Sequence, residues 1–291
     1  MTKLVKKDGT SIVTAKDLGF TLPIGVIRGG GRDRSFSLKE HGYDTEKALG
    51  EWKKLNHGKP TTAVVTKLIA LLLDSLGGEP FEHLPGDPLD VEAKKLGDVS
   101  SLYSADVFYI YSRARIEELG NEYITPFVCE KETCNFTAEE MIHDLDSMEV
   151  TCVEDISELE KEVPLVKGIR FRDGSIRKKL IVSPMLWHGM DSSGIIGKED
   201  ELLVKLYFIS KCVTGVEGND GAIVLLPDEL KSLRKIDIEI LDREINSISL
   251  GPSFVSRGNC PECNDHQIFR LDWSYNHFFG VSSLPTPGKK S

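Results

Sequence analysis

Four of the six cysteines occur in two close pairs, which is the spacing used by metal-binding turns. Cys129 and Cys134 form a C-x4-C, and Cys260 and Cys263 form a C-x2-C. Each pair can supply two thiolates from one short turn, and four thiolates complete the tetrahedral shell of zinc. Such a shell leaves no open position for a substrate. The sequence therefore predicts a structural Zn²⁺ site on Cys129, Cys134, Cys260 and Cys263.

Other arrangements of the same residue types remain open. His266, shortly after Cys263, could replace one thiolate, and His143 with Cys152 could form part of a site in the first half of the chain. The thiols could also be reduced and free of metal. A redox role is disfavoured because Cys260 follows a loop and does not begin a helix, so no helix dipole lowers its pKa. Cys152 and Cys212 stand alone in apolar segments and are expected to be buried.

No catalytic arrangement emerges from the remaining residues. The segment from Arg28 to Arg34 is rich in glycine but lacks the G-K-[ST] ending of a phosphate-binding loop, so a flexible turn is predicted. His188 and His277 lie near aromatic residues, with no nucleophile spaced to use them. We therefore expect a protein that is not an enzyme and has no small-molecule substrate.

The elements that lead into the two cysteine pairs have the same spacing. In each, an Asp begins a helical run that ends at a Gly 14 residues later, and the first cysteine follows after 9 more. Equal spacing of this kind indicates an internal duplication, although chance resemblance between two generic segments is the alternative. The corresponding residues are Asp106, Gly120 and Cys129 in the first copy and Asp237, Gly251 and Cys260 in the second.

Earlier segments also correspond. An apolar helix is predicted from Pro60 to Gly77 and another from 201 to 213, ended by Gly215, while 136–150 is predicted to be helical or mixed. We predict an α+β fold of two related repeats, each with short antiparallel strands, helices and a cysteine knuckle. Residues 1–153 form the first repeat with the C-x4-C, 154–162 an acidic linker, and 163–291 the second repeat with the C-x2-C and a C-terminal tail.

Composition excludes several classes of protein. The 291 residues are 40% hydrophobic and carry a formal net charge of −10, which argues against sequence-independent binding of nucleic acid. No apolar run approaches the roughly 20 residues of a membrane span, and the N-terminus lacks the apolar core of a signal peptide. A cytosolic chain without membrane or nucleic-acid partners is expected. Phe278 and Phe279, before the tail, are either a docking site for a neighbouring protein or part of the core.

The order of these motifs resembles that of the T-even-type bacteriophage baseplate proteins, a family of hub components and hub-assembly factors. The resemblance rests on Leu22-Pro23-Ile24-Gly25, a buried helix ending in Gly-Gly, the helix from Asp106 to Gly120, and the paired cysteines. It covers most of 20–150 and, more weakly, 163–280. The C-x4-C spacing and the two copies depart from the family pattern.

The resemblance implies a structural protein of the phage tail baseplate, made in the host cytoplasm and then part of the virion. Its partners would be other tail and baseplate proteins. The alternatives are an assembly chaperone that is absent from the mature particle and a zinc-ribbon-type nucleic-acid-binding module. The acidic residues around the knuckles, in CEKETC and CPECND, disfavour the latter.

Overall fold

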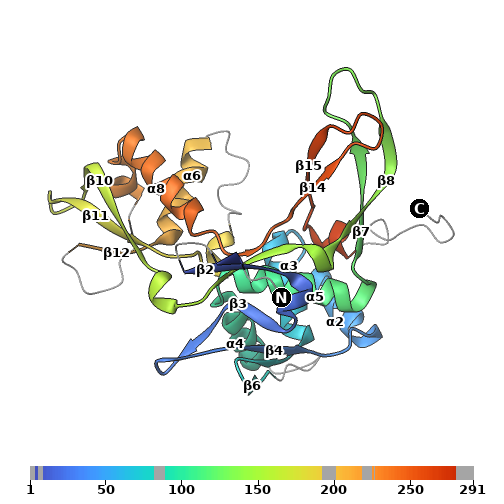
Figure 1. The fold of residues 1–291 in the computed structure, drawn as a ribbon. Helices are drawn as coiled ribbons and strands as arrows, with labels where there is room; N and C mark the ends of the chain where they lie inside the picture. Colours follow the sequence, from blue (N-terminus) through green and yellow to red (C-terminus); the bar gives the residue numbers. More distant parts are fainter. Residues whose placement is uncertain are drawn as a thin grey trace.

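The computed structural model describes residues 4–5, 9–81, 89–191, 201–217, 225 and 227–279. These residues form helices and several small sheets in which every strand pairing is antiparallel, so the predicted α+β class is confirmed (Figure 1). No helix in the described ranges is long and apolar enough to cross a membrane.

The first body is built around a sheet and the buried helix α5 (Ser104–Leu119). The strand order is β3–β4–β5–β6, with bounds Thr21–Arg28, Gly31–Leu38, Leu73–Leu76 and Glu79–Pro80. The other helices are α2 (Tyr43–Leu55), α3 (Thr61–Leu72) and α4 (Leu89–Ser100). Most of the α5 side chains are buried, including Arg115, whose guanidinium donates to the carbonyl oxygens of Phe278, Gly120 and Glu122.

A second sheet on this body joins strands from the beginning, middle and end of the chain. Its order is β1–β2–β9–β13, with bounds Leu4–Val5, Thr10–Thr14, Glu149–Val153 and Gly251–Pro252. The short helix α1 (Ala15–Leu18) follows β2, and 3-10 turns occupy Leu145–Ser147 and Ile156–Glu158.

A second body has its own apolar core (Figure 1). Its sheet has the order β10–β11–β12, with bounds Lys161–Arg170, Ile176–Val182 and Val213–Val216. The 3-10 turn η3 (Trp187–Met190) precedes its helices, which are α6 (Glu201–Cys212), α7 (Pro227–Lys231) and α8 (Lys235–Ser247).

The sheets β3–β4–β5 and β10–β11–β12 have corresponding registers. The first strand of each contains a bulge with a glycine at positive φ, namely Gly25 (φ 104°) and Gly168 (φ 84°). A side chain is strained at such angles, so glycine is required there. The pairs that flank the bulge are Thr21–Ser35 and Val26–Asp33 in one sheet and Pro164–Lys179 and Ile169–Arg177 in the other.

An aspartate at the third residue of a helix holds each bulge. The carboxylate of Asp106 in α5 accepts the N–H groups of Ile24 (2.8 Å) and Gly25 (3.0 Å). The carboxylate of Asp237 in α8 accepts those of Val166 (2.6 Å) and Gly168 (3.1 Å). Because a bulge removes N–H groups from the ladder, these carboxylates satisfy donors that burial would otherwise leave unpaired.

Two apolar helices end earlier than the sequence pattern predicts. The helix expected from Pro60 to Gly77 stops at Leu72, because Leu73–Leu76 pairs with β4 as β5. The helix expected over 201–213 stops at Cys212, where β12 begins and pairs with β11. The segment 136–150, predicted as helical or mixed, supplies β8 (Thr137–Asp144) and the start of β9.

The end of the described chain returns to the first body. Helix α9 (Tyr275–Phe278) buries Phe278 completely, with its ring stacked on Tyr111 at 5.0 Å between centroids. Phe279 packs against the same cluster. The docking interpretation of this aromatic pair is therefore wrong for Phe278, since the core already covers it. The tail after Phe279 lies outside the described residues.

Candidate metal centre

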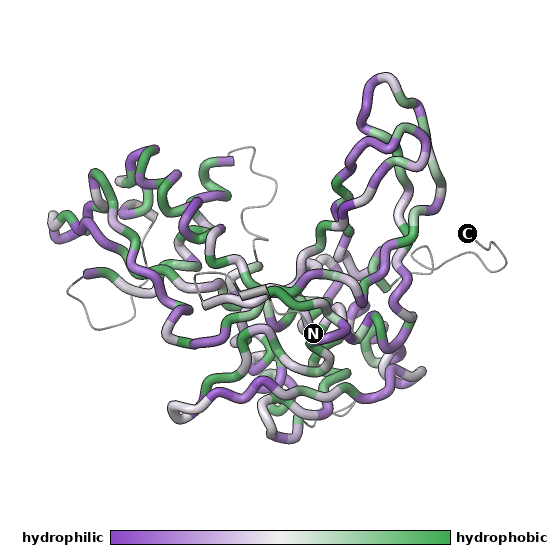
Figure 2. The backbone as a smooth tube through the Cα atoms, in the orientation of Figure 1, coloured by the Kyte–Doolittle hydropathy of each residue, from purple (hydrophilic) through white to green (hydrophobic). Residues whose placement is uncertain are grey.

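Two β-hairpins carry the cysteine pairs at their tips. The first hairpin consists of β7 (Glu122–Val128) and β8, and the second of β14 (Val255–Asn259) and β15 (His266–Arg270). The hairpins extend together away from the first body, and hydrophilic and hydrophobic residues alternate at their tips (Figures 1 and 2). Each strand pair thus ends in a short turn that begins with a cysteine, Cys129 in one and Cys260 in the other.

The four sulfur atoms of the predicted site converge. All lie within 4.8 Å of one another, with 3.7 Å between Cys129 and Cys263 and 3.8 Å between Cys134 and Cys260. A disulfide needs about 2.05 Å, so these are free thiols. Sulfurs bound at about 2.3 Å to one tetrahedral metal lie about 3.8 Å apart. The cluster is therefore compatible with a metal site.

Backbone N–H groups point at the sulfurs within each turn. Burial raises the pKa of Cys260, but hydrogen bonds from the N–H groups of Cys263 and Glu262 and from the thiols of Cys263 and Cys129 together lower it to about 7. Burial raises the pKa of Cys129 to about 12, against the effect of the Lys131 N–H. A cation bound between the sulfurs would favour the deprotonated form of all four ligands.

Apolar and polar contacts join the two hairpins beneath the tips. The rings of Phe127 and Phe269 lie 5.3 Å apart in a small cluster that also contains Cys129 and Cys260. The side-chain oxygen of buried Gln267 accepts the N–H of Glu130, 3.1 Å away, and so links the second hairpin to the first knuckle. Sequence reasoning missed Gln267, since nothing in its local pattern distinguishes it from a surface glutamine.

The alternative histidine ligands are engaged elsewhere. His143 is buried on β8, its Nε2 lies 2.8 Å from the Thr125 hydroxyl, and burial lowers its pKa. His266 is exposed, with Nδ1 at 3.4 Å from the side-chain oxygen of Asn259. Within the described ranges, the candidate metal-ligand cluster contains the four cysteines and neither histidine. Cys152 and Cys212 are buried far from a knuckle, as expected.

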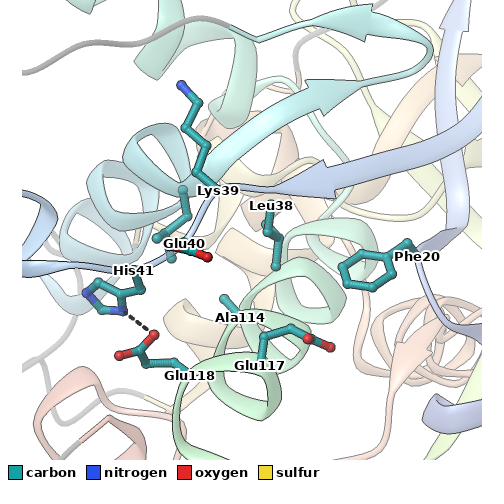
Figure 3. A pocket seen from close by; sticks show the side chains of 9 residues that line it. Phe20, Leu38, Lys39, Glu40, His41, Ala114, Glu117 and Glu118 are labelled. Carbon is teal, nitrogen blue, oxygen red and sulfur yellow. Dashed lines mark ion pairs between the residues drawn. The ribbon is translucent and has the colours of Figure 1, made fainter.

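A pocket on the first body offers different chemistry (Figure 3). Apolar side chains, among them Phe20 and Leu38, meet the carboxylates of Glu117 and Glu118 there. The buried His41 ring faces Glu118 at 4.0 Å and lies 2.8 Å from Glu46. Glu117 pairs with Arg113, and no serine, threonine or cysteine lines the pocket. The predicted glycine-rich turn Gly29–Gly30 connects β3 to β4, and Arg32 donates to backbone oxygens of Ile24 and Val153.

Comparison with known proteins gives no identification: no family model, no curated protein and no solved structure matches this chain.

Proposed function

We propose that the four cysteines bind one structural Zn²⁺ that fastens the hairpin β7–β8 to the hairpin β14–β15. The observation that carries the proposal is the convergence of the four sulfurs within 4.8 Å of one another. Two of their separations, 3.7 and 3.8 Å, match the edge of a zinc–thiolate tetrahedron. Four thiolates also suit iron, so metal identity belongs to the test. The shell is complete with protein ligands, which favours a structural role over a catalytic one.

The two halves of the site derive, in this proposal, from an internal duplication. The corresponding bulges, aspartates and registers of the two bodies support it. So does the equal placement of Asp106 and Asp237 at the third helical residue. Each copy would contribute one hairpin and two ligands, so that neither copy alone closes a metal shell. The domain division at 154–162 remains part of the same hypothesis.

The protein would act by binding neighbouring proteins. Both hairpins expose apolar side chains although they stand clear of the body, namely Val128, Ile142, Val255 and Ile268. Exposed apolar groups on a projecting element are typical of an interaction surface. Zinc would keep the hairpin pair rigid, which lowers the entropy lost when a partner binds.

The resemblance stated above suggests which partners. We propose that the chain is a structural component of a bacteriophage tail baseplate and binds other tail proteins. The alternative is an assembly chaperone that is absent from the mature particle. Mass spectrometry of purified particles distinguishes the two, since only the structural component stays in the virion. The acidic residues Glu130, Glu132 and Glu262 at the knuckles count against the zinc-ribbon nucleic-acid module.

Metal analysis of the purified chain tests the zinc. We expect about one zinc per chain, falling to near zero in Cys129→Ser and retained in Cys212→Ser, whose thiol is buried outside the cluster. A stoichiometry near zero in the wild type, or iron in place of zinc, would overturn the assignment.

A further inference from the structure

A cavity of about 470 Å³ on the second body is lined by four basic side chains. Lys167 and Arg170 lie on β10, Lys231 lies at the end of α7, and Arg234 immediately precedes α8. All four are exposed, and none of the residues that line the cavity is acidic. A concentration of positive charge in a recess attracts anions, and the N-terminal end of α8 adds to the same potential.

Hydrogen bonds fix the walls of this cavity. The Arg170 N–H donates to Ser232 Oγ at 2.9 Å, which ties the turn before α8 to β10. The buried Asp237 carboxylate accepts N–H groups of the same strand, including that of Lys167 at 3.1 Å. Against the one carboxylate of Asp237, Lys167, Arg170 and Arg234 supply three positive charges. Among the described ion pairs, none involves Lys167, Arg170 or Arg234.

The first body has a pocket at the corresponding place, whose lining contains one basic residue, Arg28, and one acidic residue, Asp98. Gly25 corresponds to Gly168 at the bulge, and Tyr103 corresponds to Arg234 as the residue before the helix. Two residues after each bulge glycine, the first body has Ile27 where the second has Arg170. The same backbone is therefore built without these cations, so the fold does not require them.

We infer that this cavity is a docking site for an acidic segment of a partner protein. Lys167, Arg170 and Arg234 can each donate to carboxylates, and arginine does so through two parallel hydrogen bonds. Ile176 and Leu233 line the same cavity and provide apolar contact for a peptide. A nucleic-acid site would favour a groove with aromatic side chains for stacking, whereas no aromatic residue lines this recess.

The overall charge of −10 is compatible with such a partner. A short acidic segment in the cavity interacts mainly with charges within about 8 Å at physiological salt, and the residues that line the cavity include four basic and no acidic side chains. A long polyanion would also meet the acidic remainder of the surface. The inference rests on the proposed role in binding neighbouring proteins, but it does not depend on the metal. Metal analysis and peptide binding can therefore fail separately.

Fluorescence anisotropy with a fluorescein-labelled octaglutamate peptide tests the site in the full chain. The variant is Arg170→Gln/Arg234→Gln, and the matched control Lys47→Gln/Lys54→Gln removes the same charge from exposed positions on α2. Arg234 makes no capping hydrogen bond through its side chain, so the variant keeps α8. Circular dichroism and the Tm report its folding.

We expect the wild type and the control to bind the peptide alike and the variant to bind about tenfold more weakly. Raising the salt from about 50 to about 200 mM should weaken binding by the wild type. Absence of binding at low salt, or equal Kd values for variant and control, would overturn the inference. Tighter binding of a dT12 oligonucleotide that is lost in the variant would replace the acidic protein partner with nucleic acid.

Discussion

Removal of the metal should lower the thermal stability of this protein by an amount that follows from its chain topology. The metal would connect Cys134 to Cys260, which are 126 residues apart in the sequence. In the chain-entropy treatment, a cross-link over a loop of this length raises the free energy of unfolding by about 5 kcal/mol. For a chain of this size each kcal/mol changes the Tm by roughly 2 °C, so chelation should lower the Tm by about 10 °C.

Differential scanning calorimetry with and without a chelator measures this change. Cys134→Ser should melt near the temperature of the chelated wild type and should respond little to chelator, because it lacks one of the four ligands. Cys212→Ser keeps all four ligands and should retain the full response, whatever its own Tm. A chelator-induced decrease below about 2 °C in the wild type, equal to that of Cys134→Ser, would refute the cross-link argument.

Three further substitutions test the framework. Asp237→Asn places an amide nitrogen against backbone donors and should lower the free energy of unfolding by about 2–4 kcal/mol in urea titrations; an unchanged midpoint would count against the bulge contact. Gly168→Ala should cost more than Gly174→Ala, since both have positive φ but only at Gly168 would a new Cβ meet a carbonyl oxygen at 2.6 Å; equal costs would contradict this. Burial lowers the pKa of His143 below 6.5, so its contribution to stability is present above pH 6.5 and lost as the pH falls towards the folded pKa. The stability difference between the wild type and His143→Gln should shrink over that range, and a constant difference would refute the assignment.

The sequence predicted the features that depend on local spacing. The cysteine turns are local, and the two sulfurs of each turn need partners from another segment to complete a tetrahedron. Their spacing therefore predicts one cluster shared by the two turns. The structure places the four sulfurs together. Asp106 and Asp237 each occupy the third position of a helix, and Cys129 and Cys260 each follow the first strand of a hairpin. The helical run predicted to end at Gly251 was too long, because α8 ends at Ser247 and Gly251 begins β13. The bound metal itself stays a proposal.

Features that depend on tertiary context were missed. Leu73 and Leu76 extend the helical apolar spacing of α3 across Asp74 and Ser75, and so short a segment does not distinguish the end of a helix from a strand. Pairing with β4 decides in favour of the strand. Phe278 is similar, because an aromatic residue before a polar tail has the same local pattern whether a partner or its own core covers it. Stacking of its ring on Tyr111, 167 residues away in sequence, shows that its own core covers it.

The basic cavity illustrates a third limit. Arg170 and Arg234 are 64 residues apart, and each looks like an ordinary surface cation in its own segment. The bulge held by Asp237 brings their two segments together. The first body has the uncharged residues Ile27 and Tyr103 at the corresponding positions, so the positive charge of Arg170 and Arg234 is particular to the second body. This difference in charge between the two pockets can be recognised only after the residues of the two bodies are aligned.

The position of the second hairpin determines what the proposed zinc can hold. β13 pairs with β9, and Leu271 and Phe278, which follow β15, lie in the core of the first body. Both hairpins therefore emerge from the first body, while the β10–β12 sheet has a separate core. A metal in the cluster would therefore fix the hairpins to each other without contacting the second body. Hydrogen exchange after chelation should accelerate in 122–144 and 255–270 but not in β11. Equal acceleration in β11 would show instead that the metal couples the two bodies.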